Sequence, residues 1–363
     1  MKKNLTSYTP LRKHIHAPLL FLLMILVIAS CKKHDFSFPL KNYEQVNLVS
    51  DVSGYNAAHI DKALLNAWGI AVAPSGPIWI SANHSGSSPV YSSTGVTLIP
   101  PVWVPGPDSK TPGAPTGIVF NSTSDFIIKS TNQKGRFIFA GEDGVISAWG
   151  GGTAAIKVAD RSAWEAVYKG LALASDMGTN FLYATDFKNS HVDVFDKDFN
   201  YVSNKPFKDP QIPSDYGPFN IRLIDGFLYV TYAKHKGPDN EDDEAGAGHG
   251  YIDVYTTGGI LVHRFASGGA LNSPWGLVAA KGGFCDVKDA ILVGNFGDGR
   301  INVYGRMGNF EGQLKQSGNN HPIEIEGLWA LENNVPGTDS SQVFFTAGPG
   351  DEEHGLFGYI KRK

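Results

Sequence analysis

Six residues near the starts of predicted β-strands carry side chains that suit the binding of a polar ligand. They are Asn66, Trp68, Asn220, Asn272, Trp275 and Glu326. Aromatic planes beside amides and a carboxylate can hold a sugar or another polyhydroxylated ligand by stacking and hydrogen bonding. Large aromatic side chains also fill protein cores, so packing is the alternative role for the two tryptophans. The sequence therefore predicts a candidate ligand site and leaves the role of its aromatic members open.

Two long acidic loops each end in a His-Gly pair, at His249 and at His354. Their acidic runs are Glu241–Glu244 and Asp351–Glu353. His84 occupies a comparable loop nearer the start of the chain. Imidazoles with carboxylates nearby could bind Zn²⁺ or serve as acid and base near neutral pH. Acidic, glycine-rich loops are also common as solvated surface, and this plainer interpretation stays open.

An apolar segment that could position these residues recurs six times along the chain. The segments begin at Gly69, Gly117, Gly170, Asn220, Gly276 and Gly327, between 48 and 56 residues apart. This spacing is close to the ~40–50 residues of a four-stranded propeller blade. A nearly continuous apolar strand follows each segment, as expected for strands buried on both faces, and a third strand then alternates polar and apolar residues. The predicted fold class is all-β, a six-bladed β-propeller.

The sixth repeat has no recognisable fourth strand after its third. A strand-like run at residues 43–50, ahead of the first repeat, is free to supply it. Closing the ring with this N-terminal strand would remove an exposed sheet edge. We therefore expect residues 41–363 to form one propeller, with its candidate ligand residues at one mouth of the central channel, where ligands generally bind.

Several motifs resemble those of a known group of proteins. They are Asn66–Ala71, Gly248–Tyr255, Asn272–Leu277 and Phe345–Gly358. Together they look like an uncharacterised bacterial family of exported propellers with NHL-like repeats, some of whose members carry a PEP-CTERM sorting tail. The resemblance covers essentially the whole predicted propeller. It implies a fold and export, and it transfers no catalytic residue.

A second, narrower resemblance concerns metal binding. Glu326, followed by Gly327 and Leu328, is similar to the strand start of calcium-dependent lactonase propellers. There a carboxylate and amides from successive blades meet at one ion, and oxygen ligands suit Ca²⁺. The corresponding positions of the other repeats hold Trp, Thr, Lys and Phe, which departs from that pattern.

The first 40 residues are typical of a processed leader. Basic residues precede the apolar run 19–29, which is about half the ~20 residues that a membrane-spanning helix needs. Ile28–Cys31 then resembles a bacterial lipobox. We expect a lipoprotein signal peptide at residues 1–30, lipidation of Cys31, a tether at residues 31–40 and a lipid-anchored protein at the bacterial cell envelope, facing the periplasm or the outside. An ordinary secreted protein that keeps this cysteine is the alternative. If Cys31 carries lipid, Cys285 has no disulfide partner within the chain.

Two classes of function remain open at the level of sequence. The first is a binding or scaffolding module that presents its channel mouth to a glycan, peptide or protein; it needs no cofactor, and we expect a monomer. The second is a hydrolase or lyase acting on a lactone or saccharide, possibly Ca²⁺-dependent. A net charge of −4 and the absence of a basic run after the leader disfavour a nucleic-acid partner.

Overall fold

The computed structural model describes residue 1 and residues 40–363, and strands dominate this part of the chain. The predicted signal peptide, Cys31 and nearly all of the tether lie outside the described residues, so lipidation stays a prediction. Within the described part, no helix is both long and apolar enough to cross a membrane.

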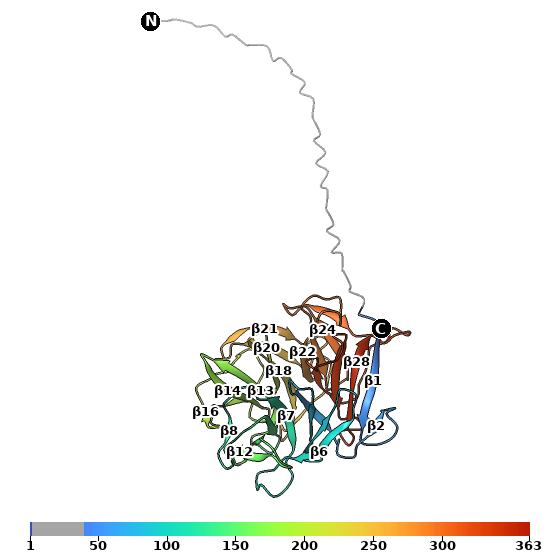
Figure 1. The fold of residues 1–363 in the computed structure, drawn as a ribbon. Helices are drawn as coiled ribbons and strands as arrows, with labels where there is room; N and C mark the ends of the chain where they lie inside the picture. Colours follow the sequence, from blue (N-terminus) through green and yellow to red (C-terminus); the bar gives the residue numbers. More distant parts are fainter. Residues whose placement is uncertain (2–39) are drawn as a thin grey trace. The chain divides into compact units, whose positions relative to one another are not determined.

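Six antiparallel sheets follow one another in chain order, as the colours of Figure 1 show. Blade 1 contains β3 (Ala67–Val72), β4 (Ile78–Ala82), β5 (Ser87–Tyr91) and β6 (Thr97–Trp103). Blade 2 contains β7 (Pro115–Phe120), β10 (Phe137–Gly141), β11 (Val145–Trp149) and β12 (Ile156–Asp160). Blade 3 contains β13 (Tyr168–Asp176), β14 (Thr179–Asp186), β15 (His191–Phe195) and β16 (Tyr201–Val202).

The second half of the ring repeats this order. Blade 4 contains β17 (Tyr216–Ile224), β18 (Phe227–Lys236), β20 (Tyr251–Tyr255) and β21 (Leu261–Ser267). Blade 5 contains β22 (Pro274–Ala279), β23 (Ile291–Asn295), β24 (Ile301–Tyr304) and β25 (Phe310–Gln313). Blade 6 contains β26 (Leu328–Glu332), β27 (Gln342–Ala347), β28 (Leu356–Arg362) and β1 (Tyr43–Ser50). Each first strand contacts the first strands of both neighbouring blades, and β26 contacts β3, which closes the ring. The predicted six-bladed propeller is confirmed.

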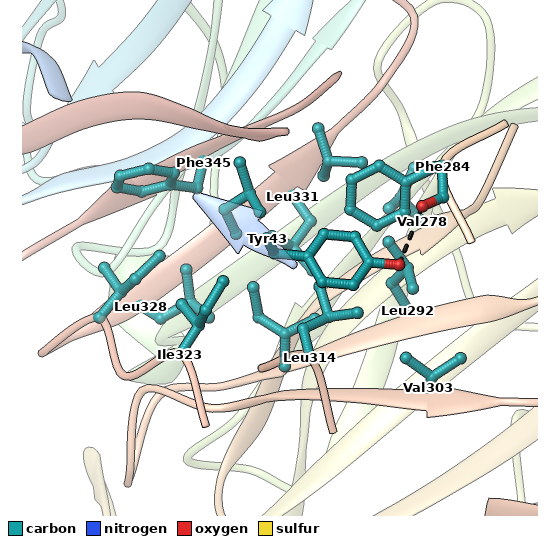
Figure 2. Packing of buried hydrophobic residues seen from close by; sticks show 14 of the residues in the cluster. Tyr43, Val278, Phe284, Leu292, Val303, Leu314, Ile323, Leu328, Leu331 and Phe345 are labelled. Carbon is teal, nitrogen blue, oxygen red and sulfur yellow. Dashed lines mark hydrogen bonds between the residues drawn. The ribbon is translucent and has the colours of Figure 1, made fainter. Parts of the chain in front are cut away.

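The N-terminal strand closes the last blade as predicted. β1 pairs antiparallel with β28, in a register that runs from Tyr43 opposite Arg362 to Ser50 opposite Leu356. Tyr43 is 1% exposed, and its hydroxyl donates a 2.9 Å hydrogen bond to the carbonyl oxygen of Phe284. Figure 2 shows its ring among apolar side chains of blades 5 and 6. The strand thus fastens two blades together as well as covering an edge.

The repeated glycine is explained by the approach of the next blade. A Cβ added to Gly69 would lie 2.5 Å from the carbonyl oxygen of Thr116, and one added to Gly276 would lie 2.8 Å from the carbonyl oxygen of Trp329. Both contacts are closer than real side chains tolerate. Glycine therefore recurs because neighbouring first strands lie against each other around the channel.

In every blade the pairing of the first and second strands shifts register beside this position. Such a bulge takes a residue out of the ladder and re-aims its side chain. The residues at the six shifts are Trp68, Thr116, Lys169, Phe219, Trp275 and Trp329. The sequence repeat places Glu326 and Gly327 at this point of blade 6, whereas the structure places Trp329 and Ala330 there. Gly327 instead adopts a left-handed conformation, with φ of 65°, ahead of the strand.

Three small additions to the ring were not predicted. A hairpin of β8 (Ile127–Ile128) and β9 (Gln133–Lys134) is inserted in blade 2. The short strand β2 (His59–Ile60) runs parallel to β1. The third, β19 (Asp242–Asp243), pairs with the end of β18 and holds the acidic loop of blade 4 in place.

Candidate functional site

The channel is filled by aromatic side chains at the level of the bulges. Trp68 stacks on Trp329 with ring centroids 3.5 Å apart, and Trp275 meets both rings edge-on at about 6 Å. Phe219 and Phe187 belong to the same buried cluster. Since these residues come from five different blades, they can meet only at the channel. We call this cluster the aromatic plug.

The burial of the plug favours one of the two roles that the sequence leaves open for the tryptophans. Trp68 is 1% exposed and Trp275 is 4% exposed, so both rings are packed inside the ring of blades. The indole nitrogen of Trp275 donates a 3.2 Å hydrogen bond to the carbonyl oxygen of Lys169. The positions of the two tryptophans match the packing role, in which their rings fill the channel beneath its mouth.

The three candidate asparagines are also engaged within the fold. The side-chain oxygen of Asn66 accepts a 3.0 Å hydrogen bond from the indole nitrogen of Trp329. The side-chain oxygen of Asn220 accepts a 2.8 Å hydrogen bond from the backbone amide of Ile221. The side-chain oxygen of Asn272 accepts a 2.7 Å hydrogen bond from the backbone amide of Gly246. These oxygens are the atoms that a calcium ion would need. The amide part of a lactonase-like calcium site is therefore not formed by these residues.

A polar layer around Lys169 covers the plug. Lys169 is 3% exposed, forms an ion pair with Glu142 of blade 2 and lies 3.8 Å from a carboxylate oxygen of Asp242 of blade 4. Its ammonium nitrogen is 5.3 Å from the centre of the Trp68 ring. Burial alone would lower the pKa of Lys169, but the charge of Glu142 and their hydrogen bond hold it above its ordinary value. The channel thus contains a charged lysine that sequence reasoning did not single out.

An acidic cavity of about 1010 Å³ opens beside this layer, where loops of blades 4, 5 and 6 meet. Eight carboxylates and a single lysine, Lys236, line it. The acids are Asp242, Asp243, Glu244, Asp298, Glu324, Glu326, Asp351 and Glu352. Glu244 pairs with Lys234 and Glu324 with Arg300, and Asp242 lies near Lys169. The other five form no ion pair with a residue that the structure describes, although the charge of Lys169 acts on Asp243 and Glu352.

Glu326 is the one predicted ligand residue that lines this cavity. It is exposed, and its carboxylate accepts a 3.1 Å hydrogen bond from the amide of Gly350 in the loop between β27 and β28. Glu326 is thus shared by the predicted site and this cavity. The cavity is rich in carboxylates, whereas the sequence predicted aromatic and amide groups beside a single carboxylate.

The three candidate histidines have separate partners. His354 lies 2.9 Å from Asp51, His249 lies 2.8 Å from the carbonyl oxygen of Glu244, and His84 lies 3.4 Å from the side-chain nitrogen of Asn66. Within the described part of the chain, a different group, made of Asp186, His191 and Asp193, brings three possible metal ligands within 4.8 Å of one another.

That group is better explained as a hydrogen-bond network of blade 3. His191 lies 2.9 Å from one oxygen of Asp193, and Tyr168 donates a 2.6 Å hydrogen bond to the other. The guanidinium of Arg161 lies 3.5 Å from the same carboxylate. A positive charge so close opposes the binding of a cation at this group.

Glu352 has the most distinctive ionisation in the cavity. Burial raises the pKa of its carboxyl group to about 7, and the 2.6 Å hydrogen bond from Asn66 opposes this rise. The charges of Glu142 and Asp242 raise the pKa further, and that of Lys169 lowers it. The charge of the cavity therefore changes near neutral pH.

Replacing Glu352 with glutamine is expected to stabilise the protein in alkaline solution. The folded state holds the proton of Glu352 more tightly than the unfolded chain does, so stability falls as pH rises from about 4.5 to about 7. Glutamine keeps an acceptor for Asn66 without the buried charge. We expect Glu352→Gln to raise the free energy of unfolding at pH 8 by roughly 2–3 kcal/mol, and by much less at pH 4.5. Urea titrations at both pH values test this, with Glu353→Gln, an exposed neighbour, as the control; an equal gain at both values would contradict it.

Sequence comparison finds relatives of nearly full length in a virus. The chain is 34% identical to the uncharacterised protein L690 of Acanthamoeba polyphaga mimivirus over 331 residues, which cover 87% of this chain and 85% of L690. It is 34% identical to the uncharacterised protein R648 of the same virus over 316 residues, or 84% of this chain and 76% of R648. A search of protein-family models gives no match.

Solved structures with the same fold have diverse activities. Virginiamycin B lyase from Staphylococcus aureus matches with a TM-score of 0.52 at 13% identity, over 88% of this chain and 98% of that enzyme. The GH93 α-L-arabinofuranosidase of Fusarium graminearum matches with a TM-score of 0.55 at 14% identity, over 88% and 97%. At such low identity these likenesses show the propeller fold alone.

The expectation of a bacterial family is wrong, because the curated relatives are viral. The motifs that suggested a bacterial family include Asn66–Ala71 and Asn272–Leu277. In the structure their tryptophans and glycines pack the plug and the contacts between blades. Such residues follow from propeller geometry, so they do not distinguish one lineage of propellers from another.

Proposed function

This chain belongs to the viral family that includes mimivirus L690 and R648, and we propose that it is a binding protein. It takes a positively charged ligand into the acidic cavity at its channel mouth. The observation that carries the proposal is that five carboxylates that form no ion pair with any described residue line one cavity. They are Asp243, Asp298, Glu326, Asp351 and Glu352.

Like charges lie close together in this cavity. Carboxylates gathered on one concave wall repel one another, and the surrounding protein focuses their field on the cavity. A cationic ligand relieves this repulsion as it binds. A cavity of about 1010 Å³ is far larger than a metal ion needs, so an extended organic cation fits its size better.

The alternative of a hydrolase or lyase finds less support. Its calcium-dependent form needs amides and acids that converge on one ion, and the amide oxygens of Asn66, Asn220 and Asn272 are already hydrogen-bonded within the fold. Binding requires only the charged cavity that is present.

Spermine, a flexible tetra-amine, is a suitable probe of this proposal. We expect isothermal titration to show binding to the full chain at low salt, and affinity that falls steeply between 20 and 300 mM NaCl because salt screens the attraction. The triple variant Asp298→Asn, Glu326→Gln, Asp351→Asn should bind about tenfold more weakly or worse, since each lost charge contributes on the order of 0.5–1 kcal/mol.

The matched control removes three acids outside the cavity, by Glu44→Gln, Glu165→Gln and Glu311→Gln. It has the same net charge as the first variant. Equal weakening in both variants would mean that spermine responds to net charge alone, and the proposed site would be rejected.

A further inference from the structure

We infer that the cavity accepts an arginine side chain, which stacks its guanidinium on Phe296 and donates hydrogen bonds to Asp243. This inference rests on the proposed function, because it names the kind of cation that the acidic cavity selects. Two features of the cavity wall carry it, in addition to the carboxylate charge.

The first feature is a carboxylate oxygen that lacks a donor. Asp243 lines the cavity, yet its Oδ2 atom is buried and accepts no hydrogen bond from the described residues. The ion pairs of the nearby Lys169 are made with Glu142 and Asp242. Leaving a buried acceptor without a donor costs stability. A ligand that brings N–H groups to this oxygen recovers that cost.

The backbone fixes Asp243 in this position. Asp243 belongs to β19 and stands opposite His235 of β18 in the pairing register. The carboxylate is therefore carried by a paired strand segment and not by a free loop. Burial raises the pKa of Asp243, and the nearby hydroxyl of Ser273 and the charge of Lys169 oppose this rise.

The second feature is an aromatic platform. Phe296 lines the cavity and stacks on Trp329 with ring centroids 3.9 Å apart and planes inclined by 18°. Trp329 in turn stacks on Trp68. One face of Phe296 is thus supported by two further rings of the plug, which hold it rigid at the cavity wall.

Arginine suits this pairing of groups better than lysine. Its guanidinium is planar, stacks on aromatic faces and is weakly hydrated, and its five N–H groups can serve several carboxylates at once. Glu326 and Glu352 also line this cavity and can receive the remaining donors. A lysine ammonium is strongly hydrated and lacks a flat face, so it gains less from Phe296.

The test compares N-acetyl-arginine amide with N-acetyl-lysine amide in NMR titrations of the full chain, with spermine as a third ligand. We expect the arginine amide to bind at least fivefold more tightly than the lysine amide. Asp243→Asn and Phe296→Leu should each reduce this preference to less than twofold. Phe296→Tyr keeps a flat ring and should retain it, and Phe310→Leu, which replaces an exposed ring on the outer strand β25, should leave it unchanged.

The outcomes separate this inference from the proposed function. Tight binding of spermine without any preference for arginine would overturn the inference and leave the acidic cavity as a general cation site. Failure of all three cations to bind would reject both. A preference for arginine that survives both Asp243→Asn and Phe296→Leu would overturn the assignment of these two residues.

Discussion

Deletion of residues 41–50 is expected to leave a chain that no longer unfolds in one cooperative transition and that aggregates at micromolar concentration. The deletion removes β1, whose loss uncovers the edge of β28 along its whole paired length. An uncovered, flat strand edge is a template for pairing between molecules. The deletion also removes Tyr43 and Val49 from the core, where each is at most 1% exposed.

Tyr43→Ala gives a graded form of the same test. The ring is buried among residues of blades 5 and 6, as Figure 2 shows, and its hydroxyl is hydrogen-bonded to Phe284. Truncation of such a side chain typically costs about 3–5 kcal/mol. Glu44→Ala, on the next residue of the strand but partly exposed, should cost less than about 1 kcal/mol. Guanidinium titrations followed by circular dichroism measure the free energy of unfolding of both point variants. A deletion variant that is fully stable and unfolds cooperatively would contradict closure of the ring by this strand.

Lys169→Met is expected to destabilise the protein by about 3–5 kcal/mol, since it breaks a buried ion pair and leaves its partner uncompensated. The ammonium of Lys169 stands among Glu142, Asp242 and Glu352. Without it, three carboxylates would repel one another above the aromatic plug. Lys197→Met, in an exposed ion pair with Asp198, should change the free energy of unfolding by less than about 1 kcal/mol.

The double variant identifies the cause of this loss. In the Lys169→Met background, Glu142→Gln removes the uncompensated charge and should recover part of the stability, so that the two changes are not additive. Strict additivity in a double-mutant cycle would mean that the lysine acts through packing on Trp68 alone.

The fold could be predicted because propeller geometry constrains the sequence at every repeat. Gly69 and Gly276 recur at places where the next blade leaves no room for a Cβ atom. Blade 6 shows the limit of this signal. In this blade Ala330 takes the place that glycine has in other blades. The sequence pattern therefore points to Gly327, which belongs to a turn three residues earlier.

The site was harder to predict, because its residues are brought together only by closure of the ring. Glu142 stands on a hairpin loop, where turn chemistry alone accounts for an acid. Its partner Lys169 occupies the same repeat position as Trp68 and Trp275. A lysine at a position that otherwise favours large apolar residues was the sequence feature that could have indicated a functional role. The acidic loops were visible in the sequence, but their convergence on one cavity depends on the neighbouring positions of blades 4, 5 and 6.

The most direct test of the acidic cavity is a crystal structure of the protein grown with spermine. We expect electron density for the amine between blades 4, 5 and 6, with its nitrogen atoms within hydrogen-bonding distance of Asp243, Glu326 or Glu352. Spermine bound only on the outer strands of the blades, with the cavity holding water alone, would contradict it.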